Sequence, residues 1–188
     1  MAISLATPLC GANLNPLVTL SNCLKRESKY RWKLFPLYLI AQFLGAFAGL
    51  FWCEFIGRGL QPEMLLVDSY DIGRVILNEG MGVFIFLFFM LMLSNPNTTF
   101  IENELTGYMS ITFFYYIARS FAPFANSTLN PIFTIALGFQ YGTKDKWETL
   151  GNCWAWIIGD IIGCLCAIYF YQLIYEPIVR ELREIRRK

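Results

Sequence analysis

Leu129-Asn130-Pro131-Ile132-Phe133-Thr134 follows the same pattern as Leu14-Asn15-Pro16-Leu17-Val18-Thr19, which stands 115 residues earlier in the chain. In each copy, an asparagine precedes a proline that opens a short apolar run, Pro16–Leu24 or Pro131–Phe139. Asparagine at the cap position and proline at the first helical position favour the start of a helix. Because nine helical residues reach only about 14 Å, half of a bilayer, the pattern predicts two re-entrant half-helices.

Four longer apolar runs surround the two half-helices. Each has 19 to 23 residues, which matches the roughly 17–25 residues of a spanning helix. Three crossings separate the two half-helices, so the two repeats are inverted in the membrane, an architecture of many channels and transporters. The expected fold is an all-α membrane protein, an incomplete inverted-repeat bundle of four spanning helices plus two re-entrant half-helices. The runs are Leu34–Ile56, Val75–Leu93, Leu105–Phe124 and Trp154–Ile174.

The composition excludes several classes of protein. Of the 188 residues, 56% are hydrophobic and only 15% are charged, against about 25% in soluble domains, and the net charge is +1. These values exclude a soluble domain, a disordered chain and a nucleic-acid binder. The chain has no histidine and six scattered cysteines, so no metal site, disulfide framework or cofactor is expected. No nucleophile–base pair indicates an enzyme.

The basic residues predict how the chain is oriented. Ten of the fifteen lysines and arginines lie in residues 25–33 and in the tail after Pro177. Four crossings separate these segments, so both are expected on the same side, as the positive-inside rule prefers. The chain is expected to be one multi-pass membrane domain, 1–188, with a partial first repeat (9–57), a second repeat (75–175) and a charged helical tail (176–188). A mitochondrial inner membrane is one hypothesis for its location.

The two repeats are unequal. Each carries a Gly-x-x-x-Gly face for close helix packing, Gly45/Gly49 and Gly159/Gly163. Two full spans precede Asn130, whereas only fourteen residues precede Asn15. The internal symmetry therefore predicts two further helices before Asn15, and we expect other membrane subunits to cover the face near Leu9–Val18.

The sequence resembles the aquaporin (major intrinsic protein) family. Residues 11–19, Gly-Ala-Asn-Leu-Asn-Pro-Leu-Val-Thr, are similar to the family's Gly-Ala-His-x-Asn-Pro-Ala-Val-Thr, and residues 41–46 resemble its third-helix signature. Glu79 stands where the family carries a buried glutamate in the fourth helix. The resemblance covers residues 9–175 without the first helix and most of the second. It implies that Asn15 and Asn130 donate hydrogen bonds in a single-file pore and that Pro16 and Pro131 start the half-helices and pack together.

Several positions depart from the family pattern. Leu17 and Ile132 replace the two motif alanines, and such larger groups are expected to separate the half-helices or block the lumen. Phe133 replaces the arginine of the selectivity filter, and Asn13 replaces the histidine before the first motif. The filter position of the fifth helix falls near Ala118.

Asp160 stands where the sixth helix of the family usually has proline. A charge in a membrane helix costs roughly 2.5–3.5 kcal/mol. We therefore expect Asp160 to pair with Arg119, or both to share a polar pocket with Glu79. A structural ion pair is favoured over two functional alternatives, in which Arg119 replaces the filter arginine or the acids relay protons.

Two functions remain open. The loss of helices, of the filter arginine and of the motif alanines favours a non-conducting structural subunit of a larger membrane complex. The alternative is a channel for water or a small neutral solute that another chain completes.

Overall fold

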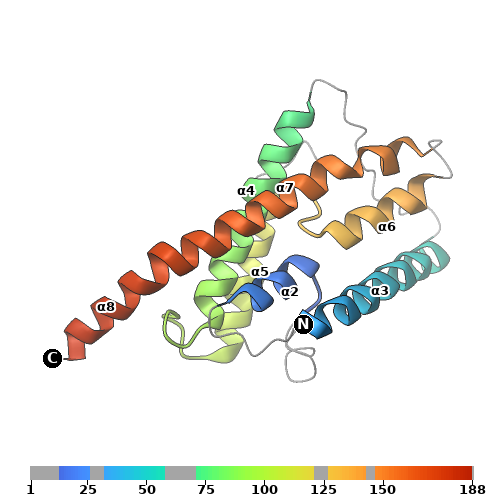
Figure 1. Ribbon diagram of the computed structural model, residues 1–188. Coiled ribbons are helices and arrows are strands. Elements are labelled where there is room, and N and C mark those ends of the chain that lie inside the picture. Colours follow the sequence, from blue (N-terminus) through green and yellow to red (C-terminus); the bar gives the residue numbers. More distant parts are fainter. Residues whose placement is uncertain (1–12, 26–31, 58–70, 121–126, 143–146, 188) are drawn as a thin grey trace.

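The computed structural model describes residues 13–25, 32–57, 71–120, 127–142 and 147–187 (Figure 1). These residues form helices and no strand, as expected for an all-α membrane protein. The elements, in chain order, are α2 (Pro16–Leu24), η1 (Trp32–Leu34), α3 (Phe35–Ile56), α4 (Ile72–Ser94), α5 (Glu104–Ser120), α6 (Pro131–Gly142), α7 (Glu148–Phe170), the π-helical η2 (Tyr171–Tyr175) and α8 (Glu176–Arg187).

Both half-helices are present. α2 has the predicted bounds and 9 residues, and α6 has 12 residues, since it continues past the predicted end at Phe139. Among the residues that the structure describes, three segments are long and apolar enough to cross a membrane: Trp32–Ile56, Ile72–Ser94 and Leu150–Arg186. The run predicted as a fourth span, Leu105–Phe124, contributes the 17 residues of α5, and its last four residues lie outside the described part of the chain.

The α4–α7 pair is the centre of the bundle (Figure 1). Gly80 of α4 lies against Gly159 and Gly163 of α7, and a Cβ atom on Gly163 would collide with the Gly80 carbonyl oxygen. A Cβ atom on Gly159 would stand only 2.7 Å from the carbonyl oxygen of Ile76. The predicted Gly159/Gly163 face is therefore a close helix–helix contact, and it sets how α4 and α7 are rotated against each other.

The matching face of α3 has no such contact. A Cβ atom on Gly45 or Gly49 would meet no heavy atom within 4 Å among the described residues. Leu50 is the one buried residue of α3, although the helix touches α6 and α2 on one side. The packing role predicted for Gly45 and Gly49 is thus not realised in the described part of this chain.

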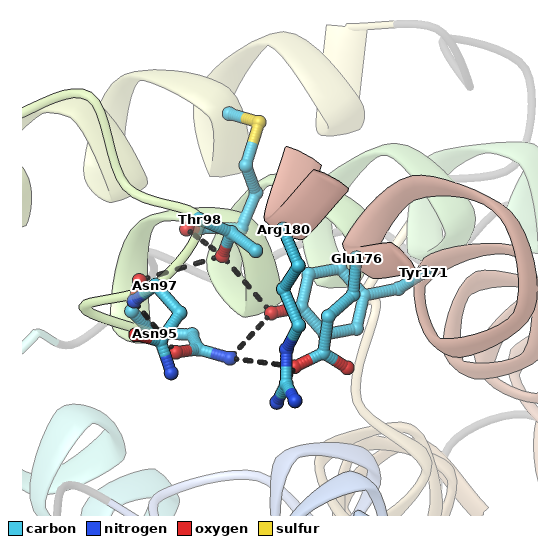
Figure 2. A network of polar contacts seen from close by, with 7 residues as sticks. Asn95, Asn97, Thr98, Tyr171, Glu176 and Arg180 are labelled. Carbon is cyan, nitrogen blue, oxygen red and sulfur yellow. Dashed lines mark hydrogen bonds and ion pairs between the residues drawn. The ribbon is translucent and has the colours of Figure 1, made fainter. Parts of the chain in front are cut away.

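α7, η2 and α8 form one continuous helix that projects beyond the other elements (Figure 1). Polar contacts attach this helix to the segment after α4 (Figure 2). The Asn95 side-chain amide donates to the Tyr171 hydroxyl at 2.9 Å and to the Glu176 carboxylate at 3.1 Å. The Thr98 and Tyr171 hydroxyls lie 3.0 Å apart, so the junction with α8 is held by side chains of η2, α8 and the 95–98 turn.

Candidate functional site

The first turn of each half-helix is capped by the asparagine of its motif. Asn15 has extended backbone angles, and its Oδ1 accepts a hydrogen bond from the Leu17 N–H at 2.9 Å. The Asn130 Oδ1 accepts from the N–H groups of Ile132 and Phe133 at 3.1 and 3.3 Å. Each cap satisfies backbone donors that a helix start leaves free, which is why the Asn-Pro pair starts a helix at both places.

The amide nitrogens of the same asparagines link the two motifs. Asn15 Nδ2 donates to the carbonyl oxygen of Leu129 at 2.6 Å, and Asn130 Nδ2 lies 3.5 Å from the carbonyl oxygen of Leu14. Each amide thus reaches the residue that precedes the other asparagine. The structure brings together two motifs that are more than a hundred residues apart, with Asn15 buried and Asn130 half-buried.

Glu79 of α4 holds the segment that leads into α6. Its Oε1 accepts from the Leu129 N–H at 2.7 Å and from the Thr128 N–H at 3.1 Å. Leu129 has φ 50°, a left-handed conformation that costs about 1 kcal/mol or more in a residue with a side chain. The Glu79 carboxylate therefore positions a strained turn directly before Asn130.

Asp160 lies beside Glu79 at the α4–α7 contact. Its side chain is fully buried, and no N–H or O–H group of another described residue donates a hydrogen bond to its carboxyl oxygens, so its polar neighbour is the Glu79 carboxyl group. Arg119 is exposed on α5 and lies beside the Tyr115 hydroxyl instead. The predicted direct Arg119–Asp160 ion pair is therefore wrong, because Asp160 faces α4 whereas Arg119 lies on the exposed surface of α5. For the alternative, a polar pocket shared with Glu79, Asp160 and Glu79 do lie together, and Tyr115 lies within electrostatic range of both acids and of Arg119.

The positions that depart from the family pattern lie in packed surroundings. Leu17 and Ile132 are 2% and 8% exposed, and Phe133 packs on the core residues between α6 and α7. Ala118 is fully buried with its carbonyl oxygen close to Gly82 of α4, so it faces a helix contact rather than an open space. Asn13 is buried as well and accepts a hydrogen bond from Asn22 Nδ2 at 2.9 Å.

A cavity of about 1410 Å³ opens beside the paired asparagines. Asn15 and Asn130 line it together with one face of α5, and Lys25, Arg183 and Arg186 contribute cationic groups. Burial lowers the pKa of the Lys25 ammonium, and the nearby Glu176 carboxylate opposes this shift. Sequence reasoning did not identify the α5 face, although its members recur at helical spacing: Glu104, Tyr108, Ile111, Thr112 and Tyr115.

The residues that form these features are spread over almost the whole chain. They belong to the paired caps, to the glutamate that holds the second motif and to the glycine contact between α4 and α7. A sequence model of the family described as "Major intrinsic protein" matches residues 1–171. The chain belongs to the major intrinsic protein family. Members of this family are membrane channels rather than enzymes, so the expected resemblance and the absence of an enzyme function are confirmed.

Several relatives in this family match the chain at low identity. Aquaporin PIP2-1 of Arabidopsis thaliana is 23% identical over 174 residues, which cover 88% of this chain and 59% of that protein. A probable aquaglyceroporin-2 of Gibberella zeae is 27% identical over 157 residues, 81% of this chain and 41% of that protein. Aquaporin PIP2-4 of Zea mays is 23% identical over 186 residues, 95% of this chain and 63% of that protein. The chain thus spans roughly half of the length of these major intrinsic proteins.

Proposed function

We propose that this chain contributes to a membrane channel for water or small neutral solutes. One observation carries the proposal: the cavity beside α5 extends to both motif asparagines. Membership of a family that includes aquaporins and aquaglyceroporins supports the same class of solute.

The chemistry at the inner end of the cavity suits an uncharged, hydrogen-bonding solute. The N-termini of α2 and α6 meet there, and the positive ends of two helix dipoles repel cations. The Asn130 amide makes only a long 3.5 Å contact with Leu14, so a solute oxygen competes readily for this donor. A neutral solute can thus replace the weak internal contact without leaving a charge in the membrane.

We further propose that other membrane subunits complete the channel on the face formed by α3 and the start of α2. Apolar side chains of α3 such as Leu44 and Phe51 are 64% and 68% exposed. Within the described residues, the Leu14 N–H has no acceptor, whereas the equivalent Leu129 N–H donates to Glu79. A partner helix that packs on α3 and offers an acceptor to Leu14 would reproduce the α4–α7 arrangement in the first repeat.

A non-conducting structural subunit is the second candidate. It is favoured by one observation, namely that both motif amides already contact backbone carbonyls, while the bulky Leu17 and Ile132 side chains are buried. In this case the half-helices act as a rigid membrane-embedded support, and the permeability of the bilayer does not change.

Cysteine modification in proteoliposomes distinguishes the two candidates. Thr112 lines the cavity, whereas the neighbouring Phe113 is 61% exposed and lies outside the cavity lining. Thr112→Cys and Phe113→Cys are prepared with Cys10, Cys53 and Cys166 changed to serine, and the chain is purified together with its membrane partners. Osmotic swelling is then followed before and after reaction with a bulky water-soluble thiol reagent.

If the chain is part of a channel, vesicles that contain it should swell several-fold faster than empty vesicles. The thiol reagent should then slow the swelling of vesicles with Thr112→Cys but not of vesicles with Phe113→Cys. Swelling at the rate of empty vesicles, before and after modification, would support the structural subunit and overturn the channel proposal. Equal slowing of both variants would show that the solute does not pass through this cavity.

A further inference from the structure

α8 has an amphipathic arrangement opposite to the usual one, because its polar face contacts the bundle. Arg183 donates to the carbonyl oxygens of Pro96 and Thr99 at 3.0 and 2.6 Å. Glu176 accepts from Asn95 on the same side of the helix (Figure 2). The apolar side chains on the other face, Ile178, Leu182 and Ile185, are 52%, 51% and 62% exposed.

The spacing of these apolar residues is that of a coiled-coil seam. Ile178, Leu182 and Ile185 are separated by four and then three residues, which places them at positions d, a and d of a heptad. On a helix of 3.6 residues per turn they form a narrow stripe within a total arc of about 60°. Such a stripe matches a second helix better than a broad lipid surface, which would need a wider apolar face.

The charges that flank the stripe favour a second copy in parallel orientation. In the same heptad, Glu181 occupies position g and Arg186 occupies position e, and both are exposed. In a parallel pair, position g of one helix faces position e of the other five residues further on, so Glu181 meets Arg186 twice by symmetry. An antiparallel pair would instead oppose Glu181 to Glu181 and Arg186 to Arg186, which is repulsive.

The geometry of the chain makes this parallel pairing accessible. α8 continues the axis of α7 without a break and extends past the other helices (Figure 1). Copies inserted in the same direction therefore carry their α8 helices parallel and at the same depth. Confinement to one membrane raises the effective concentration of the two helices, which compensates for the shortness of the seam.

We propose that α8 joins two copies of this chain through a parallel two-stranded coiled coil, with Ile178, Leu182 and Ile185 as its seam and Glu181–Arg186 pairs on both sides. This interaction surface is separate from the asparagine motifs, and it shares Arg186 with the lining of the cavity. It does not depend on whether the chain conducts a solute.

Disulfide trapping in liposomes tests the seam. Ile185→Cys places a thiol in the seam, and Glu184→Cys places one on an exposed side next to it, each with Cys10, Cys53 and Cys166 changed to serine. Mild oxidation of the full chain at a low protein-to-lipid ratio is followed by non-reducing electrophoresis. We expect a covalent dimer for Ile185→Cys and at least about fivefold less for Glu184→Cys.

Charge exchange tests the orientation. Glu181→Arg and Arg186→Glu are each combined with Ile185→Cys, and each is expected to lower the trapped dimer by roughly threefold or more. The double exchange, Glu181→Arg with Arg186→Glu, is expected to restore the dimer, because opposite charges then face each other again. Rescue of this kind distinguishes the pairing from a general effect on folding.

Three results would overturn the proposal. Equal trapping at positions 184 and 185 would mean random collision rather than a seam, and absence of trapping at 185 would mean that the stripe is not paired with a second copy. An environment-sensitive fluorophore at position 182 that reports insertion into anionic vesicles, with no dimer, would assign the stripe to lipid instead.

Discussion

Asn15 and Leu129 are joined by a hydrogen bond of 2.6 Å from the side-chain amide of the first motif to the backbone carbonyl that precedes the second. The reciprocal contact, from the Asn130 amide to the Leu14 carbonyl, is 3.5 Å long. The junction of the two half-helices is therefore asymmetric, with a tight contact on the buried side of Asn15 and a loose one at Asn130.

This asymmetry predicts that the two asparagines differ in their effect on stability. Asn15→Ala removes a helix cap worth about 1 kcal/mol and leaves the buried Leu129 carbonyl without its partner, for a total of about 2 kcal/mol or more. Asn130→Ala is expected to cost only about 1 kcal/mol, since its crossing contact is weak. Thermal unfolding of both variants in detergent measures the difference. Equal losses would contradict the asymmetry.

Glu79 is expected to be the most sensitive polar residue of the site. Glu79→Ala removes the acceptor of the Thr128 and Leu129 N–H groups, and each buried unsatisfied donor costs about 1–3 kcal/mol. Glu79→Gln keeps an acceptor oxygen and is expected to lose less. Unfolding midpoints, together with hydrogen exchange at residues 128 and 129, provide the measurement. A glutamine variant as unstable as the alanine variant would show that charge, rather than the acceptor, holds this turn.

The glycine faces of α7 and α3 are expected to respond differently to the same substitution. Gly163→Ala places a methyl group against the Gly80 backbone, and such overpacking costs about 1–3 kcal/mol. Gly49→Ala adds a methyl group where nothing lies within 4 Å among the described residues, so the purified chain should keep its stability. Matched unfolding curves in detergent test this pair. If Gly49→Ala destabilised the isolated chain as strongly, α3 would have an intrachain contact on that face.

The stability of the chain is expected to rise with pH on the alkaline side. Burial lowers the pKa of Lys25 below its ordinary 10.5 in the folded chain. Between the lowered value and 10.5, the unfolded chain binds more protons than the folded chain, so the free energy of unfolding increases with pH. Lys25→Met should flatten this slope, whereas Lys33→Met, at an exposed position, should not. An unchanged slope in Lys25→Met would place its source elsewhere.

Local chemistry made the elements of the fold predictable. The Asn-Pro caps predicted where α2 and α6 begin, because capping and proline geometry act within one turn. Apolar length predicted α3, α4 and α7, since a bilayer selects for about 20 apolar residues irrespective of packing. The third predicted run is described only in part, as the 17 residues of α5, so its predicted end at Phe124 stays a prediction.

The contacts of the site were harder to predict. Glu79 was identified through the family resemblance, but its acceptance of two backbone N–H groups depends on where α4 places its carboxylate. The prediction of a direct Arg119–Asp160 pair was wrong for the same kind of reason. The direction in which a side chain points around a helix axis follows from packing rather than from sequence distance.

The sequence by itself therefore determined a membrane-embedded inverted repeat with two asparagine-capped half-helices. Only the tertiary structure decided which groups meet at its centre, namely Asn15 with Leu129 and Glu79 with Thr128 and Leu129. The physical reason is the close approach of Gly80 to Gly159 and Gly163, which sets the rotation of α4 against α7 and so the direction in which Glu79 and Asp160 point.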